Sequence, residues 1–143
     1  ISVKQYFGID TEMEIDGFIL NRLQGALLNE AMRLYSEGYA KSDEIDATIR
    51  DGLGLRWAFM GPFETIDLNA PGGIRDYMSR YGSVFIEMAK NQTKIPDWSD
   101  KMGEKLEVER RKILPQDQLE ERAKKRNLLL KSLRKVKIEY GEV

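Results

Sequence analysis

The stretch from Asp16 to Gly38 constrains the fold most, because it is predicted to form one long helix that is apolar on nearly every side. Its apolar residues are Phe18, Ile19, Leu20, Leu23, Leu27, Leu28, Met32, Leu34 and Tyr35. A surface helix carries an apolar stripe, whereas a helix that is apolar nearly all round is buried among others. We therefore expect an all-α domain, a helical bundle built around this long central helix.

Composition predicts one soluble domain. The chain has 143 residues, of which 41% are apolar and 33% charged, and at this length a domain can bury a sizeable core. The net charge of −1 gives no overall field that would attract nucleic acid. No apolar run is long enough to span a bilayer, and no secretory signal is visible. With no cysteine, these features fit a cytoplasmic protein without membrane or nucleic-acid partners.

Histidine is absent as well, and this restricts the possible chemistry. The residue most often used as a general base and as a metal ligand is missing, so we expect no metal site. Acid–base catalysis within this chain would require Asp, Glu, Lys or Tyr. If the chain belongs to an enzyme, its reactive groups are expected to lie elsewhere.

Beyond the long helix, we divide the chain into an N-terminal arm or interdomain-linker remnant (residues 1–13) and a helical domain (residues 14–143). Caps, glycines and prolines set the expected boundaries of the remaining helices. These helices are expected from a Ser42 cap to Gly52, over Phe63–Leu68, over Ile74–Tyr81, from Val84 to Asn91, from a Ser99 cap to Leu114, and over Asp117–Ile138. The segment from Gly52 to Phe63 is expected to be a well-packed turn.

The last helix is strongly basic. Eight Lys or Arg residues lie between Arg122 and Lys137, and apolar residues recur at helical spacing among them. Such charge usually forms a solvated face over a stripe that packs on the core. A basic surface for an anionic partner is the alternative.

No motif supplies a self-contained active site. The glycines at 52, 54, 72 and 73 do not follow a strand in a βαβ unit, so they do not form a dinucleotide fingerprint. The acidic cluster around Glu44 lies in the first turns of a helix and lacks the alternating ligands and central glycine of a calcium loop. The residues alone therefore indicate a helical domain without catalytic machinery of its own.

Two segments nevertheless carry a specific resemblance. GFILNRLQGALLNEAMRLYSEG, followed by SDEIDATIRDGLGLRWAFMGPFETIDLNAPGG, resembles the C-terminal domain of the 3-hydroxyacyl-CoA dehydrogenase superfamily. The likeness is closest to the lambda-crystallin and L-gulonate 3-dehydrogenase branch, because of GLGLRWAF. It implies a fold like the C-terminal domain of 6-phosphogluconate dehydrogenase and an NAD-dependent oxidation of an alcohol to a ketone. The family's NAD site and catalytic His belong to an N-terminal Rossmann domain, so NAD is expected to bind there and this chain is not expected to be active alone.

Asn21 matches the Asn of the family's NRL motif. The resemblance implies that it orients the catalytic His and the substrate oxygen. From the residues alone, an amide among Ile19, Leu20 and Leu23 is expected to be buried, and it must then find hydrogen-bond partners or cost about 1–3 kcal/mol. A purely structural amide, bonded to the preceding turn or a neighbouring loop, is the alternative.

Arg56, between Leu55 and Trp57, is our candidate substrate-binding residue. A guanidinium can hold a carboxylate by two parallel hydrogen bonds, and an L-gulonate-like substrate carries a carboxylate. The alternative is a salt bridge at an interface or a helix end. Trp57 and Phe59 are expected to pack in the domain core, or else across a dimer interface.

The expected partners are a second copy through the helical domain, the Rossmann domain of the same enzyme, and a small hydroxy-acid substrate. Two rival hypotheses remain. One is a 3-hydroxybutyryl-CoA dehydrogenase, which shares the fold and differs in the pocket. The other is a non-catalytic, dimeric helical interaction module.

Overall fold

The computed structural model describes residues 18–141, and the expected arm at residues 1–13 lies outside them. The described chain is all-α, as expected, and contains no strand. Its elements are α2 (Phe18–Ser36), α3 (Ser42–Thr48), the π-helical turn η1 (Ile49–Leu53), α4 (Gly54–Trp57), α5 (Pro62–Leu68), α6 (Ile74–Asn91), α7 (Asp100–Ile113), the 3₁₀ turn η2 (Gln116–Gln118) and α8 (Leu119–Glu139).

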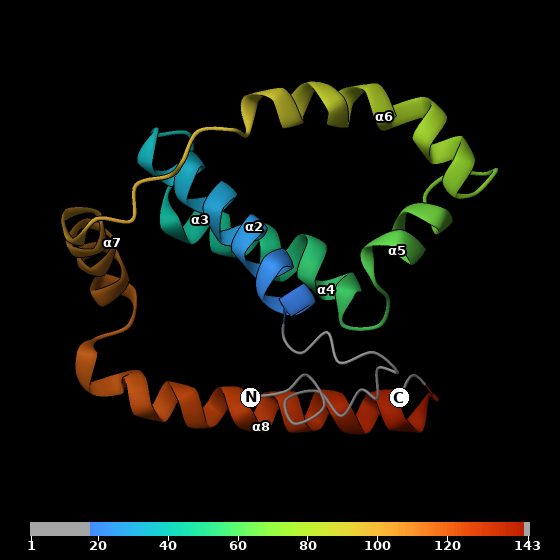
Figure 1. The fold of residues 1–143 in the computed structure, drawn as a ribbon. Coiled ribbons are helices and arrows are strands. Elements are labelled where there is room, and N and C mark those ends of the chain that lie inside the picture. Colours follow the sequence, from blue (N-terminus) through green and yellow to red (C-terminus); the bar gives the residue numbers. More distant parts are fainter. Residues whose placement is uncertain (1–17, 142–143) are drawn as a thin grey trace.

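Helix α2 runs through the middle of the described chain (Figure 1). The pair α3 and α4 lies along it, α6 passes on one side, and α8 passes on the opposite side. Helix α7 connects these layers at one end, so the elements form an open frame around α2 (Figure 1).

Burial along α2 is uneven, and this corrects the expectation of a helix enclosed over its whole length. Its C-terminal half contributes Met32 and Tyr35 to the small core, with 9% and 4% of their surface exposed. In its N-terminal half, Ile19 and Leu23 remain 51% and 61% exposed. The residue pattern was that of a buried helix, but the described elements cover only one half, so the other half presents an apolar surface.

The core is closed by a polar junction between α2, α3 and α7. Glu109 of α7 accepts hydrogen bonds from the Tyr35 hydroxyl at 2.9 Å and the Ser42 hydroxyl at 2.7 Å. The ammonium of Lys105 lies 4.9 Å from the centre of the Tyr35 ring. Ser42 was expected to be the N-cap of α3, but Lys41 holds that position, and its backbone N–H is bonded by Glu44 instead. The Ser42 hydroxyl is therefore free to bond Glu109, and this bond connects α7 to the start of α3.

We expect this junction to weaken in acid. Hydrogen bonds from Ser42 and then Tyr35 hold the pKa of Glu109 below its ordinary value. A carboxyl whose pKa is lowered by folding stabilises the native state above its unfolded pKa of about 4.3, and that stability is lost as the pH falls through the folded pKa. Thermal unfolding midpoints of the wild type and Glu109→Gln should therefore differ clearly at pH 7 and converge in acid. A difference that does not change with pH would contradict this role.

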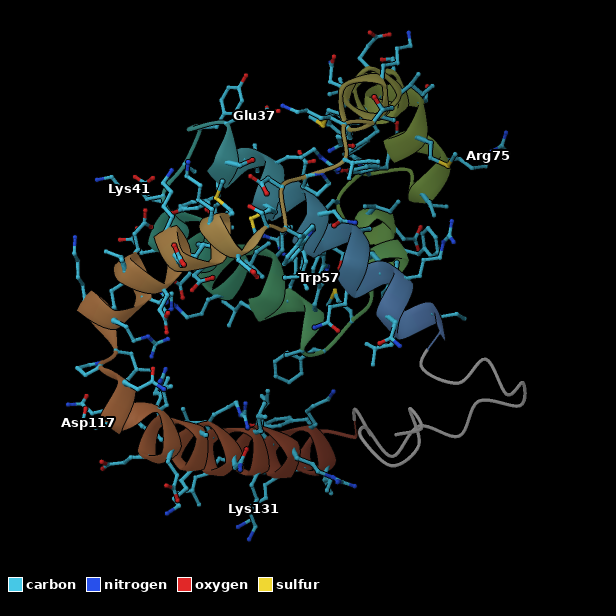
Figure 2. All side chains as sticks on the ribbon, turned by 60° about the vertical axis from the view of Figure 1, so that its left-hand side comes forward. Glu37, Lys41, Trp57, Arg75, Asp117 and Lys131 are labelled. Carbon is cyan, nitrogen blue, oxygen red and sulfur yellow. The ribbon has the colours of Figure 1, made fainter. Side chains whose placement is uncertain are left out.

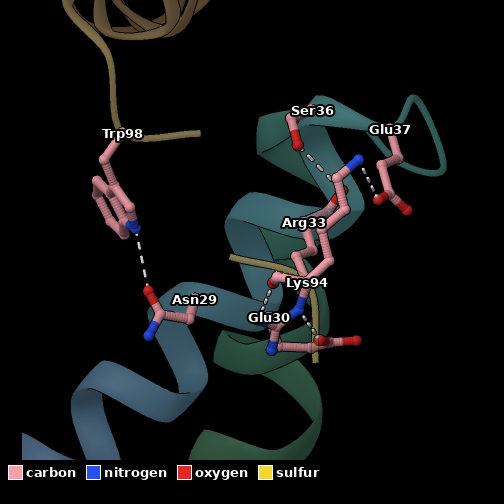
Figure 3. A network of polar contacts seen from close by, with 7 residues as sticks. All are labelled: Asn29, Glu30, Arg33, Ser36, Glu37, Lys94 and Trp98. Carbon is pink, nitrogen blue, oxygen red and sulfur yellow. Dashed lines mark hydrogen bonds and ion pairs between the residues drawn. The ribbon is translucent and has the colours of Figure 1, made fainter. Parts of the chain in front are cut away.

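Polar contacts hold the segment between α6 and α7 against α2 (Figure 3). Arg33 donates to the backbone oxygen of Lys94 at 2.9 Å, and the Lys94 ammonium pairs with Glu37 at 3.2 Å. The Trp98 indole N–H donates to the Asn29 side chain at 3.0 Å. These bonds fix the extended connection on the C-terminal half of α2, the same half that carries the core.

The Gly52–Phe63 segment is more helical than expected. Instead of stopping at Gly52, α3 continues through η1 into α4, which ends at Trp57. The backbone N–H of Gly54 reaches the carbonyl of Ile49, five residues back. A Cβ at Gly54 would lie 2.7 Å from that carbonyl oxygen, so the π turn itself requires a glycine here.

Helix α6 is continuous, although two shorter helices with a break around Gly82 were expected. A glycine inside a helix costs only about 1 kcal/mol relative to Ala, and the aromatic stripe Tyr77, Tyr81 and Phe85 stays in phase through it. The helix begins after Gly73, which has φ 80° and ψ −160°. The Asp67 carboxylate accepts from the next backbone N–H, that of Ile74, at 2.7 Å.

We predict that Gly73→Ala destabilises the chain by about 1–3 kcal/mol, because almost no residue other than glycine adopts this backbone conformation. The added Cβ would also lie 2.8 Å from the Asp67 carboxylate that caps the helix. Gly82→Ala is the control: it lies within α6 with no atom within 4 Å of the added Cβ, so helix propensity should make it neutral or stabilising. Urea unfolding followed by circular dichroism measures both, and equal effects would contradict the prediction.

The last two helices lie close to their expected bounds. The Ser99 hydroxyl accepts from the Met102 backbone N–H, as an N-cap does, and Leu114 and Pro115 separate α7 from η2. The expected stripe of α8 does not pack on a core: Leu130 and Val136, two of its members, stay 57% and 39% exposed. No helix of the described residues is long and apolar enough to cross a membrane.

Candidate functional site

Asn21 lies in the second turn of α2 and is exposed, which corrects the expectation of a buried amide. Its neighbours Ile19, Leu20 and Leu23 are also exposed, because no described element covers this half of the helix. Within residues 18–141 its side chain makes no hydrogen bond. No described residue bonds this amide, and the preceding turn named in the structural alternative lies outside the described residues.

Arg56 lies in α4 and is exposed. Among the described residues it takes part in no ion pair, whereas Arg50, six residues earlier, donates two hydrogen bonds to Asp51 at 2.8 and 2.9 Å. No described residue therefore forms an ion pair with the guanidinium group of Arg56. It can bind a carboxylate in the two-bond geometry that Arg50 shows with Asp51.

The π turn sets the direction of the Arg56 side chain. Each residue advances an α-helix by about 100°, so the extra residue of η1 rotates everything that follows by about that angle relative to α3. Gly54, whose missing side chain permits the turn, lies two residues before Arg56. Sequence reasoning placed this glycine in a turn, because a π-helical step has no periodicity signal of its own.

Both views place α4 near the N-terminal half of α2, so Asn21 and Arg56 come from neighbouring elements (Figures 1 and 2). No hydrogen bond joins their side chains. Trp57 and Phe59 are each 39% exposed, so neither is enclosed in a core by the described residues. The exposed surface of α2, of α4 and of the turn after α4 thus carries an amide, a guanidinium and two aromatic rings.

This surface can bind and orient, but it offers little acid–base chemistry. No cluster of three metal-binding side chains occurs within residues 18–141. The described elements contain no strand, so they do not build the strand–glycine turn–helix unit that holds a dinucleotide. The described residues therefore do not fit an NAD site.

The Glu109 junction was missed by sequence reasoning. Tyr35 and Glu109 are 74 residues apart, and a glutamate inside a charged helix carries no signal that distinguishes it from its neighbours. A recess of about 260 Å³ beside the junction is lined by Tyr35, Gly38, Tyr39, Ala40, Lys41, Glu44, Lys105 and Glu109. Since both Glu109 oxygens are bonded within the chain, we assign the junction to stability.

Sequence comparison gives the family of this all-α chain. The model of the 3-hydroxyacyl-CoA dehydrogenase C-terminal domain matches residues 17–115, so this chain belongs to that dehydrogenase family. A second match, to the N-terminal part of the cobaltochelatase CobS subunit, covers residues 1–19, nearly all outside the described residues.

Two groups of curated proteins are similar to this chain. Lambda-crystallin of Oryctolagus cuniculus is 42% identical over 87% of this chain and 39% of its own length. The lambda-crystallin homolog of Bos taurus is 46% identical over 65% of this chain and 29% of its own length. L-carnitine dehydrogenase of Oceanobacillus iheyensis is 35% identical over 85% of this chain and 40% of its own length. The chain thus spans less than half the length of these relatives, and the resemblance to the lambda-crystallin branch is confirmed.

Proposed function

We propose that this chain is the substrate-binding and dimerisation domain of an NAD-dependent 3-hydroxy-acid dehydrogenase that oxidises an alcohol to a ketone. The observation that carries the proposal is the family match over residues 17–115, which spans both Asn21 and Arg56. NAD and the catalytic His belong to the Rossmann domain of the same enzyme. Because the described residues contain no dinucleotide unit and the chain has no histidine, it does not transfer hydride by itself.

In this proposal the chain binds one side of the substrate. The Asn21 amide donates to and accepts from the reacting oxygen and the catalytic His, and so fixes their orientation while the chemistry occurs on the other domain. Arg56 holds the carboxylate of an L-gulonate-like acid. The exposure of both side chains supports this division, because a docked Rossmann domain would close the site over them.

L-carnitine is a second candidate substrate, favoured by the similarity to L-carnitine dehydrogenases, one of which is 41% identical over 62% of the chain. Carnitine is also a 3-hydroxy acid, so Asn21 and Arg56 would keep their roles. Its quaternary ammonium group is a ligand that aromatic faces attract. The half-exposed Trp57 and Phe59, close to Arg56 in the chain, are suitable rings.

The second copy is proposed as the partner that covers the apolar surface. Large apolar side chains stay exposed along the N-terminal half of α2, along α6 and along α8. Where such side chains adjoin on one face of a helix, they form an exposed apolar patch of the kind that marks an interaction site. Light scattering on the 143-residue chain should therefore give a dimer whose mass is unchanged by NAD.

The function is tested with the full-length protein that contains this chain. NAD reduction is followed with L-gulonate, L-carnitine and 3-hydroxybutyryl-CoA, and the 143-residue chain alone is the control. We expect turnover of one hydroxy acid by the full-length protein and none by the control. Turnover of the acyl-CoA alone would support the acyl-CoA rival, and no turnover by a dimeric protein would support the interaction module.

A further inference from the structure

Helix α8 is the longest described element, yet no other described helix packs along it. It runs beside the rest of the chain without packing on α2 (Figures 1 and 2), and its main described contact is with η2, the turn before it. Five large apolar residues remain exposed on its surface: Leu128, Leu129, Leu130, Val136 and Ile138. In proteins most of the stability of a helix comes from tertiary packing of its apolar face. The α8 helix therefore needs a surface that the described residues do not supply.

The junction before α8 separates it from the rest of the chain. Leu114 is extended, with φ −134° and ψ 100°, and Pro115 follows with ψ 151°. Proline cannot continue α7, and the residue before it is biased toward extended backbone. A short extended junction of this kind directs the following helix away from its own domain, as in proteins that exchange an element between copies.

We propose that α8 is an exchanged arm: in the dimer it docks on the second copy rather than on its own chain. The inference rests on the proposed dimerisation and adds which element makes it. In a twofold dimer every such contact is made twice, and each copy offers both an arm and an uncovered apolar face on α6.

Charge and area agree with this arrangement. Eight positive and three negative side chains give α8 a net charge of +5, so two copies of α8 packed on each other would repel, whereas the whole chain carries −1. The arm is about 31 Å long and an α-helix is about 10 Å wide, so one face covers about 310 Å². Two arms and two receiving faces together bury roughly 1,200 Å², which is the lower limit of stable specific interfaces.

Hydrogen exchange on the 143-residue chain tests the arm directly. Amides of residues 119–139 should be protected at concentrations where the mass is dimeric, and should lose protection on dilution in step with dissociation. Amides of the α2–α3–α7 junction should keep their protection at both concentrations. Protection of α8 that does not depend on concentration would overturn the proposal, because the helix would then be docked on its own chain.

A matched pair of variants tests which face of α8 docks. Leu130 shares its face with Leu133 and Ala123, whereas Leu128 lies about 200° away around the helix axis. The two leucines are similarly exposed, at 57% and 66%, so glutamate at either should affect the isolated chain alike. Leu130→Glu should raise the dimer dissociation constant at least about tenfold, and Leu128→Glu should leave it nearly unchanged.

Failure of this inference can be told apart from failure of the proposed dimerisation. If the wild type is a monomer at every concentration, the dimer itself is wrong. If it is a dimer that both variants leave intact, the dimer stands and the exchanged arm is wrong. If both variants weaken it equally, α8 contributes to the interface but docking through one apolar face is excluded.

Discussion

Asn21→Ala should lower the turnover of the full-length enzyme by about 10²–10³-fold, the usual loss when one oriented hydrogen-bond donor is removed from a reacting oxygen. The same change in the 143-residue chain should alter the free energy of unfolding by less than about 0.5 kcal/mol. The reason is that Asn21 is exposed and its side chain makes no hydrogen bond within residues 18–141. Steady-state kinetics and urea unfolding measure the two effects.

Asn29 is the matched control for this prediction, since it is the same residue type eight positions later on α2. Its side chain accepts from the Trp98 indole, so Asn29→Ala should destabilise the chain by about 1 kcal/mol and leave turnover unchanged. Asn21→Ala should thus lower turnover without destabilising the chain, whereas Asn29→Ala should destabilise the chain without lowering turnover. Turnover that Asn21→Ala does not change would dismiss its role at the reacting oxygen.

Arg56→Ala should reduce kcat/KM of the full-length enzyme for its hydroxy acid by about 10²–10⁴-fold, mostly by raising KM. Two charge-assisted hydrogen bonds to a carboxylate would be lost, each worth about 1.5–3 kcal/mol, and they are made in the ground state and the transition state alike. Arg56→Lys keeps the charge but not the paired geometry, so it should recover only part of the loss.

Arg50→Ala provides the control, because Arg50 lies in the same α3–η1–α4 segment and its guanidinium is already bonded to Asp51. It should leave KM unchanged. If Arg56→Ala instead weakens the dimer or lowers the unfolding midpoint without changing KM, the interface or salt-bridge alternative is correct. An equal response to a substrate without a carboxylate would exclude carboxylate binding.

Local chemistry predicted the described elements well. Proline at the first position of α5, Ser99 before α7 and Pro115 after it act through their own backbone or their nearest neighbours, so the sequence contains their cause. The π turn at η1 and the continuity of α6 through Gly82 were not predicted. In both cases several weak local preferences compete, and packing selects among them.

The candidate site likewise has features that the sequence predicted and features that it did not. Both candidate residues come from the sequence, Asn21 through the NRL motif and Arg56 through the charge within GLGLRWAF, and their roles stay predictions. The exposure of these two residues was not predicted, because burial depends on which elements lie nearby. An apolar pattern shows that a surface must be covered but not whether its own chain covers it, so the exposed half of α2 was expected to be enclosed.

The sequence by itself determined an all-α domain of a dehydrogenase family, because helix periodicity, caps and motif residues are properties of short segments. Only the tertiary structure decided that Tyr35, Ser42 and Glu109 close the core, and that α8 lies apart from it. Contacts between residues far apart in the chain depend on how helices pack, and the free energy of packing is shared among many weak contacts that no single segment records.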